Sequence, residues 1–123
     1  MIIGAGIDLV QITRIEKILQ KYPKNFPKKI LGNQELKIYQ KIIEKNKSNY
    51  LAKRFSAKES LIKAVSALDI DVGFIEVNLL NTLQGKPFFV FNKNSILNQY
   101  KVDISLSDDY PCAVSFVIIS SLN

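Results

Sequence analysis

Two carboxylates and one ammonium group occupy positions from which charged side chains could do chemistry. Asp8 lies inside the apolar, glycine-containing run Ile2–Val10, where a carboxylate is costly unless it is paired or binds a metal. Glu59 and Lys63 are four residues apart in a strongly helical stretch, so both project from one side of the helix. Ordinary explanations exist as well: Asp8 could cap the next helix, and Glu59 with Lys63 could form a surface ion pair.

Two short polar segments follow in the second half of the chain. Gly85–Pro87 precede an apolar run and have the composition of a turn in which proline opens a strand. Ser105–Asp108 stand at the end of an alternating strand. Their hydroxyl groups could bind phosphate oxygens, but polar residues on the solvent-facing side of a strand explain them equally well.

The composition excludes several kinds of active site. The chain has no histidine, which rules out a Ser-His-Asp triad, a Cys-His pair and a histidine-ligated zinc ion. A single cysteine, Cys112, rules out an internal disulfide framework, and its place in the apolar run Cys112–Ile119 predicts a buried strand thiol. A bound metal would therefore need carboxylate and water ligands, which indicates magnesium, calcium or manganese.

Charge and length narrow the class of partner and the size of the fold. Seventeen basic and eleven acidic residues give a formal charge of +6, which favours acidic partners: nucleic acid, an anionic membrane, a polyphosphate ligand or an acidic protein. The 123 residues fit one domain, 1–123, with a modest core, so assembly from several copies is worth considering. We expect no signal peptide, no membrane span and a cytoplasmic location.

Apolar spacing predicts one strand and then helices in the first half of the chain. The expected features are a strand over Ile2–Val10, a helix over Arg14–Tyr22, a turn or loop around Pro23 and Pro27, a helix N-capped by Asn33, a polar break at Asn46–Asn49, and a long helix over Tyr50–Leu68.

The second half changes to the alternating period of strands. Expected strands are Ile75–Leu79, Phe88–Phe91, Val102–Ser107 and Cys112–Ile119, with a short helix or loop over Asn92–Tyr100. A turn at Asp108–Pro111 should join the last two strands into a hairpin. The order of one strand, then helices, then antiparallel strands predicts an α+β fold.

Four ordered segments resemble the signature motifs of holo-acyl-carrier-protein synthases, the short type of 4′-phosphopantetheinyl transferase. The order, the spacing and the chain length all fit, and the resemblance covers essentially the whole chain. The segments are Gly6–Val10 with Arg14 and Ile15, then Arg54–Ser60 with Lys63 and Ala64, then Gly85–Pro87, and finally Ser105–Ser107.

This resemblance implies a fold, an assembly and a reaction. The fold would be that of the 4′-phosphopantetheinyl transferases, as a homotrimer with active sites between neighbouring subunits. A serine hydroxyl of apo acyl carrier protein would attack the β-phosphate of coenzyme A, giving holo carrier protein and 3′,5′-ADP in support of fatty acid biosynthesis. Mg²⁺ would be required, with oxygen ligands that suit this ion.

The resemblance also assigns roles to residues. Asp8, Glu59 and Lys63 would be catalytic, with Asp8 and Glu59 as the metal ligands, either of them able to accept the serine proton. Arg14, Lys28 and Lys29 would dock the carrier protein. Coenzyme A would be bound by Lys45 (from the adjacent subunit), Arg54, Ser60, Lys63, Gly85, Lys86, Pro87, Ser105, Ser107 and Asp108.

Two departures from the family pattern fall at the nucleotide end of the expected site. Asp108 stands where the family often has histidine, and Ser66–Asp69 stand where it often has glycines. An acid near a polyphosphate repels it, so Asp108 could point away, join the metal shell or lie near the adenine. Two alternatives stay open: a relative that has lost activity, and a non-catalytic basic module that binds nucleic acid or an acidic protein. No recognised nucleic-acid motif supports the second.

Overall fold

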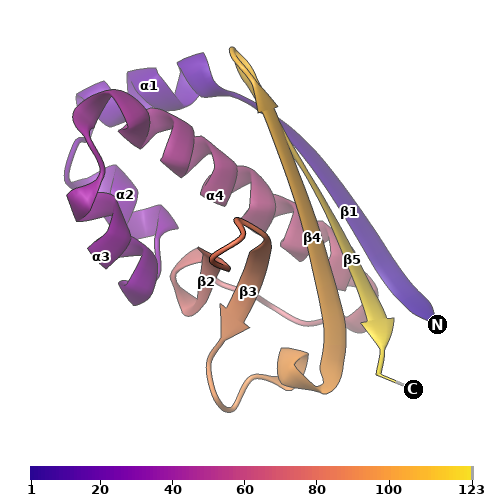
Figure 1. Cartoon of the computed structure of the whole chain (residues 1–123). Coiled ribbons are helices and arrows are strands. Elements are labelled where there is room, and N and C mark those ends of the chain that lie inside the picture. Colours follow the sequence, from indigo (N-terminus) through magenta and orange to yellow (C-terminus); the bar gives the residue numbers. More distant parts are fainter. Residues whose placement is uncertain (123) are drawn as a thin grey trace.

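The long helix α4 (Glu44–Val65) crosses one face of an antiparallel sheet, and the computed structural model describes residues 1–122 of this arrangement (Figure 1). The predicted α+β order is confirmed. The other elements, in chain order, are β1 (Ile2–Gln11), α1 (Ile12–Lys21), α2 (Asn25–Ile30), α3 (Asn33–Lys41), η1 (Ser66–Leu68), η2 (Phe74–Glu76), β2 (Val77–Asn81), β3 (Pro87–Phe91), η3 (Ile96–Gln99), β4 (Tyr100–Asp109) and β5 (Cys112–Ser121).

The strands form two antiparallel sheets. The larger has the order β1-β5-β4, and the smaller pairs β2 with β3. β4 and β5 form the expected hairpin, with Ser107 opposite Val114, and β1 pairs on the other side of β5, with Leu9 opposite Val114. The N-terminal strand therefore lies beside the C-terminal one, as Figure 1 shows.

Two glycines let α4 approach β1 closely. A Cβ atom built on Gly4 would lie 2.0 Å from the Ala64 carbonyl oxygen, and one on Gly6 would lie 2.0 Å from the Ser60 carbonyl oxygen. Both obstacles are backbone atoms, so a side chain at either position would push the helix away. Residues two apart on a strand share a face, so Asp8 also lies on the side of β1 that α4 covers.

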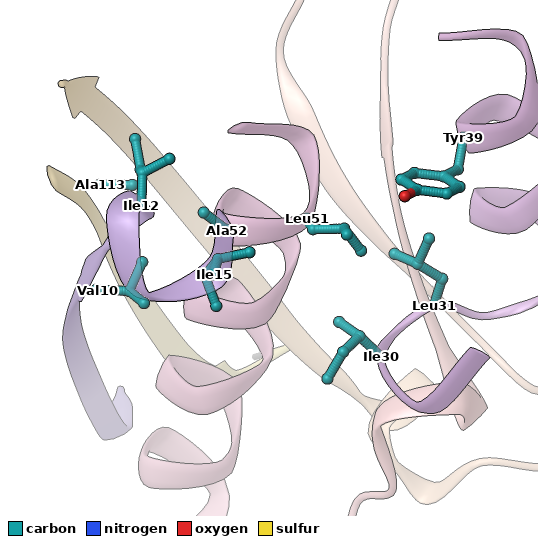
Figure 2. Close-up of a cluster of buried hydrophobic side chains, with 9 residues drawn as sticks. All are labelled: Val10, Ile12, Ile15, Ile30, Leu31, Tyr39, Leu51, Ala52 and Ala113. Atoms are coloured by element: carbon teal, nitrogen blue, oxygen red, sulfur yellow. The ribbon is translucent and has the colours of Figure 1, made fainter. Parts of the chain in front are cut away.

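Apolar side chains from every layer meet around α4. One cluster joins β1, β5 and the helices α1, α2, α3 and α4 (Figure 2). It contains Val10, Ile12, Ile15, Ile30, Leu31, Tyr39, Leu51, Ala52 and Ala113. A second cluster packs the C-terminal half of α4 on the sheet and contains Leu61, Ala64, Val65, Val77, Leu97, Val117 and Ile119. The helix that carries the second motif is thus held from several sides.

Two predictions about the helices are wrong. The stretch around Pro23 and Pro27 is not only loop, because α2 spans Asn25–Ile30 with Pro27 buried in it. Proline is tolerated in the first turn of a helix, where the missing N–H would have no intrahelical partner. The expected polar break at Asn46–Asn49 is helical, since α4 begins at Glu44. Asn46 is exposed there, whereas Lys47, Ser48 and Asn49 are half-buried.

Smaller differences concern element ends. Gly32, not Asn33, precedes the first turn of α3, and the cap comes from elsewhere: the Asn78 side-chain oxygen accepts hydrogen bonds from the Gln34 and Glu35 amides, at 3.1 and 3.0 Å. The strand predicted over Ile75–Leu79 begins two residues later, at Val77. Cys112 is a free, half-buried thiol at the start of β5.

The face of the larger sheet that points away from α4 carries exposed apolar side chains. Ile7, Leu9 and Phe116 are 61%, 68% and 42% exposed, and Ile7 lies opposite Phe116 in the strand register. We call this surface, with the exposed Ser105 and Ser107 of β4 beside it, the outer face. Within residues 1–122, no helix is long and apolar enough to cross a membrane.

Candidate active site on helix α4

The first motif meets the second at the C-terminal half of α4. The Lys63 ammonium nitrogen lies 2.9 Å from the Ile7 carbonyl oxygen and 3.5 Å from Asp8 Oδ1. The Ser56 hydroxyl donates to the Asp8 carbonyl oxygen at 3.1 Å. Lys63 is 53% exposed and the Asp8 side chain 16% exposed, so the pair lies at the edge of the α4–β1 interface, within reach of a ligand.

Glu59 supplies a second carboxylate on the same side of α4 as Lys63. It is half-buried, lies one turn before Lys63 on α4, and forms no ion pair within the described chain. Among residues 1–122 no group of three or more acidic, cysteine or histidine side chains could hold a metal. Two carboxylates with spare oxygen lone pairs fit a hard cation that keeps several waters, which describes Mg²⁺ better than an ion needing a full protein cage.

Buried serine hydroxyl groups join α4 to β5 by hydrogen bonds. Ser115 Oγ lies 2.8 Å from Ser56 Oγ and 2.6 Å from Ser60 Oγ, and it donates to the Ser56 carbonyl oxygen at 2.8 Å. All three serines are buried. The expectation that Ser60 contacts coenzyme A does not fit this placement, because its hydroxyl is fully buried and bonded inside the chain. Ser115 pairs with Asp8 in the strand register, so the cluster also fixes the position of Asp8.

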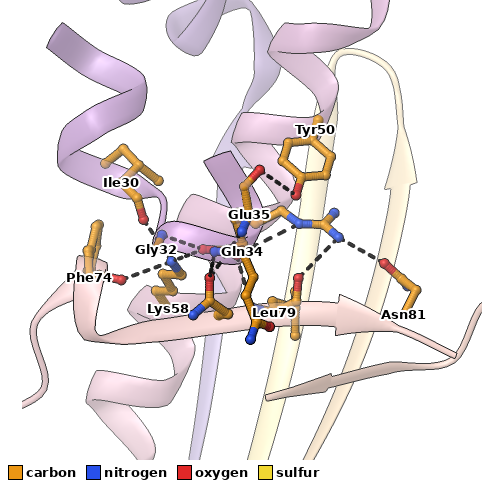
Figure 3. A network of polar contacts seen from close by, with 11 residues as sticks. Ile30, Gly32, Gln34, Glu35, Tyr50, Lys58, Phe74, Leu79 and Asn81 are labelled. Carbon is orange, nitrogen blue, oxygen red and sulfur yellow. Dashed lines mark hydrogen bonds and ion pairs between the residues drawn. The ribbon is translucent and has the colours of Figure 1, made fainter. Parts of the chain in front are cut away.

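The middle of α4 carries a buried charge network, which Figure 3 shows. Glu35 of α3 is fully buried; its Oε1 accepts from the Lys58 ammonium at 2.5 Å and from the Gly32 amide at 2.8 Å. Its Oε2 accepts from the Leu79 amide at 2.9 Å and lies 3.9 Å from Arg54 Nε. Burial lowers the pKa values of Lys58 and Arg54 below their ordinary ranges.

Asn81 connects the third motif, Gly85–Pro87, to this charge network. Arg54 Nη2 donates to Asn81 Oδ1 at 2.8 Å, and Asn81 Nδ2 donates to the Gly85 carbonyl oxygen at 3.0 Å. Gly85 has a φ of +91°, a conformation that favours glycine, and this explains the glycine in the turn. Lys86 is exposed and Pro87 opens β3 opposite Asn81.

Asp108, the residue directly after the fourth motif, forms an ion pair and a hydrogen bond with α4. Asp108 Oδ1 lies 2.9 Å from the Lys53 ammonium, and Asp108 Oδ2 accepts from Asn49 Nδ2 at 3.3 Å. The hydrogen bond from Lys53 lowers the pKa of the Asp108 carboxyl below its ordinary value. The structure thus shows Asp108 paired with Lys53, the residue before Arg54, a contact that was not among the three possibilities left open by the sequence.

Other predicted residues lie apart from this helix face. Ser105 and Ser107 are on the outer face, opposite Phe116 and Val114 in the register, and so on the side of the sheet away from α4. Lys45 is exposed in the first turn of α4, far along the helix from Glu59. Arg14 on α1, with Lys28 and Lys29 on α2, are also exposed.

Sequence reasoning missed several residues that order the site. Glu35, Lys53, Asn81 and Ser115 received no role, although each contacts a motif residue. Only Glu35 carried a usable signal, since an acidic residue three positions after a helix N-cap commonly bonds back to the cap amide. The other three have partners that are distant in the chain: Lys53 and Asp108 are 55 residues apart, Asn81 and Arg54 are 27 apart, and Ser115 and Ser56 are 59 apart. Local sequence patterns do not reach that far.

Comparison with known families decides the class of the protein. Residues 4–115 match the model of the 4′-phosphopantetheinyl transferase superfamily. The chain belongs to this superfamily. All four motif segments fall within the matched range.

Individual relatives of the chain support the same family. A holo-[acyl-carrier-protein] synthase of Orientia tsutsugamushi is 40% identical over 129 residues, and one of a Wolbachia is 43% identical over 122 residues; each alignment covers 98% of both chains. The crystal structure of a Bacillus anthracis holo-(acyl-carrier-protein) synthase in complex with CoA (3′,5′-ADP) has a TM-score of 0.83 and 31% identity, covering 98% of both chains. The family resemblance inferred from the four motifs is confirmed.

Proposed function

We propose that this chain transfers the 4′-phosphopantetheine group of coenzyme A to a serine of apo acyl carrier protein, releasing 3′,5′-ADP, in support of fatty acid biosynthesis. The observation that carries the proposal is the placement of Asp8 and Lys63, 55 residues apart, within 3.5 Å of each other and beside Glu59 in a chain of this superfamily. The complex of a relative with coenzyme A (3′,5′-ADP) supports the donor. Nothing in the structure favours the alternative of a basic nucleic-acid module.

Magnesium is the metal we expect at this site. Asp8 and Glu59 would hold it: the Asp8 carboxylate is 16% exposed and only 3.5 Å from Lys63, and Glu59 is half-buried one turn before Lys63 with no ion pair within residues 1–122. When bound, Mg²⁺ would offset the charge of the pyrophosphate under attack. The other ligands would be oxygens of coenzyme A and water.

The chain's own side chains would then perform the transfer. One of the carboxylates, Asp8 or Glu59, would accept the proton of the attacking serine. Lys63, already directed at Asp8, would contact phosphate oxygen and stabilise the charge that develops there. Arg54 would bind phosphate at the nucleotide end with its planar set of donors.

We infer that the protein is a homotrimer whose active sites lie between subunits. The exposed apolar residues Ile7, Leu9 and Phe116 of the outer face form a surface that a soluble partner would cover. The expected ligand residues Ser105 and Ser107 are on that same outer face. Glu59 and Arg54 are part of α4, and Asp8 lies on the face of β1 that α4 covers. A second copy packed on the outer face would bring these two groups of residues to one site.

Carrier-protein docking is proposed at the basic helices. Arg14, Lys28 and Lys29 are exposed on α1 and α2, and an acidic partner would be steered toward them. The cytoplasmic location stays a prediction.

The test of the function is a mass measurement. The protein is incubated with apo acyl carrier protein, coenzyme A and magnesium, and the carrier protein should gain the mass of one phosphopantetheine group. Omitting magnesium with a chelator present should stop the gain. A folded protein that modifies none of several carrier proteins would contradict the proposal.

The metal assignment has its own test. Asp8→Asn and Glu59→Gln should each abolish transfer while leaving the unfolding midpoint nearly unchanged. Glu44→Gln is the matched control, because Glu44 lies on the same helix and its side chain is 88% exposed. Full activity in either site variant would refute the assignment.

A further inference from the structure

Arg54 is only 6% exposed, and four groups lie close to its guanidinium. The ring of Tyr50, one turn earlier on α4, lies 3.9 Å from the guanidinium carbon. Arg54 Nη2 donates to the Leu79 carbonyl oxygen at 3.3 Å and to Asn81 Oδ1 at 2.8 Å. Glu35 lies 3.9 Å from Nε, which is beyond hydrogen-bond distance. The contacts with Tyr50, Leu79 and Asn81, which are labelled in Figure 3, fix both the plane and the direction of the guanidinium.

The buried charges around Arg54 do not balance. Lys58 directs its ammonium to the carbonyl oxygens of Ile30 and Phe74 and to Glu35, at 2.7, 2.9 and 2.5 Å, so its three donors are satisfied. One carboxylate therefore faces two buried cations. The nearer cation, Lys58, takes the direct contact, and Arg54 Nε has no hydrogen-bond partner within the described chain. The surplus positive charge lies on Arg54.

Asn81 links Arg54, which carries this surplus charge, to the Gly85 turn through two hydrogen bonds. Arginine can only donate and a carbonyl oxygen can only accept, so the two contacts require the Asn81 oxygen to face Arg54 and its nitrogen to face Gly85. Those contacts, at 2.8 and 3.0 Å, use both ends of one amide. Asn81 itself is exposed, so it contributes little to the core.

We propose that Asn81, with Tyr50, is a positioning residue that presets Arg54 for an anionic group and couples it to the Gly85 turn. This inference rests on the proposed function, because the anion is a phosphate of coenzyme A. Tyr50 holds the guanidinium plane by stacking, and Asn81 sets its direction without cancelling its charge. A neutral bridging residue is what such a site requires, since a carboxylate at position 81 would compete with the ligand.

Calorimetric binding of 3′,5′-ADP to the full chain tests the proposal. Asn81→Ala should weaken binding about five- to tenfold, the effect of one lost hydrogen bond to a charged group. Asn81→Asp should weaken it more, although it keeps the contact with Arg54, because it neutralises the surplus charge. Asn94→Ala is the matched control: Asn94 is exposed and has no side-chain hydrogen bond in residues 1–122, so binding should be unchanged.

Three further readouts separate positioning from a general structural effect. Tyr50→Phe keeps the stacking on Arg54 and should bind 3′,5′-ADP as tightly as the wild-type chain does. Tyr50→Leu removes the stacking and should weaken that binding. Asn81→Ala should raise KM for coenzyme A with kcat nearly unchanged. In an Arg54→Ala background, Asn81→Ala should add less than about a twofold loss, because residues acting through one another are not additive.

The outcomes that overturn the inference differ from those that overturn the function. If the unvaried chain binds 3′,5′-ADP and Asn81→Ala and Tyr50→Leu bind equally well, only the positioning role fails. The same holds if the Asn81→Ala loss is undiminished without Arg54. If the unvaried chain does not bind 3′,5′-ADP at millimolar concentration, the proposed donor fails and the inference fails with it.

Discussion

At the scale of single residues, the ion pair between Glu35 and Lys58 is the one buried most completely among the described residues. Both side chains are almost completely buried, and the carboxylate bonds to two backbone amides as well. Forming such a pair gains little over an apolar contact, but removing one partner leaves the other charge buried without compensation. Lys58 is adjacent to Glu59, so this pair also anchors the helix turn that carries the second carboxylate.

We expect Glu35→Gln to lower the free energy of unfolding by about 3–5 kcal/mol, because Lys58 and Arg54 would be left with no buried anion. Urea unfolding measures this. The control, Glu44→Gln, removes an exposed i,i+3 pair with Lys47 and should cost less than about 0.5 kcal/mol. Equal losses in the two variants would contradict the role of Glu35.

The pair of Asp108 and Lys53 predicts a pH dependence. The pKa of Asp108 is lower in the folded chain than in the unfolded chain, so its ionised form stabilises the fold. That contribution, below about 1 kcal/mol for a partly exposed pair, is fully present above the unfolded pKa of about 3.9. It is lost as the pH falls through the folded value.

Asp108→Asn should therefore be less stable than the unvaried chain near pH 6, and the difference should shrink as the pH approaches 3. Urea unfolding at several pH values measures it. Asp109→Asn serves as the control, because Asp109 is exposed and forms no ion pair among the described residues. If the difference in the free energy of unfolding between Asp108→Asn and the wild-type chain stays constant across this pH range, that result would argue against the ion pair.

At the scale of elements, the α4–β1 contact positions the site. Gly4 and Gly6 remove the side chains that would separate the helix from the strand, and the Ser56–Ser115 hydroxyl contact fixes their relative position. Asp8, the next residue on the same face, then meets Lys63. The glycine in the first motif is thus explained by packing rather than by contact with a ligand.

Gly6→Ala should destabilise the fold by about 2–3 kcal/mol or more, because its Cβ would lie 2.0 Å from a backbone oxygen of α4. Transfer activity should fall further than stability alone explains, since Asp8 moves relative to Lys63. Unfolding and the mass assay together measure both effects. Ala5→Ser, on the exposed face of β1, should change neither, and a Gly6→Ala variant with unchanged activity would refute the packing argument.

At the scale of the whole molecule, the main argument for an assembly is that the residues expected to bind coenzyme A are divided between two faces of the sheet. A 123-residue chain buries a modest core, and its outer face leaves large apolar side chains in water. Covering that face would stabilise the chain and complete the nucleotide site in one step. Activity should then depend on oligomeric state.

Ile7→Asp should convert a species of three chains into single chains of 13.9 kDa and reduce transfer strongly, because a charge on the outer face opposes its burial. Sedimentation velocity and the mass assay measure the two effects. Ile38→Asp is the control, since Ile38 is 43% exposed on α3 and away from the outer face. Single chains in the unvaried protein, with full activity, would exclude the trimer.

The sequence by itself determined the family, the α+β class and the chemical types in the site. Ordered motifs and apolar periodicity are local or linear properties, so the strand Ile2–Val10, the long helix and the C-terminal hairpin were predictable. The spacing of Glu59 and Lys63 likewise placed them on one side of a helix, because helical geometry depends only on the residue count.

Tertiary structure alone decided which partner each side chain meets. Periodicity says which face a residue occupies but not what lies against that face, so the buried hydroxyl of Ser60, the Lys53 partner of Asp108 and the Asn81 bridge required the fold. The same reason applies to Asp8. Its sequence position showed a carboxylate in an apolar strand, and only the close approach of α4 over Gly6 brought it to Lys63.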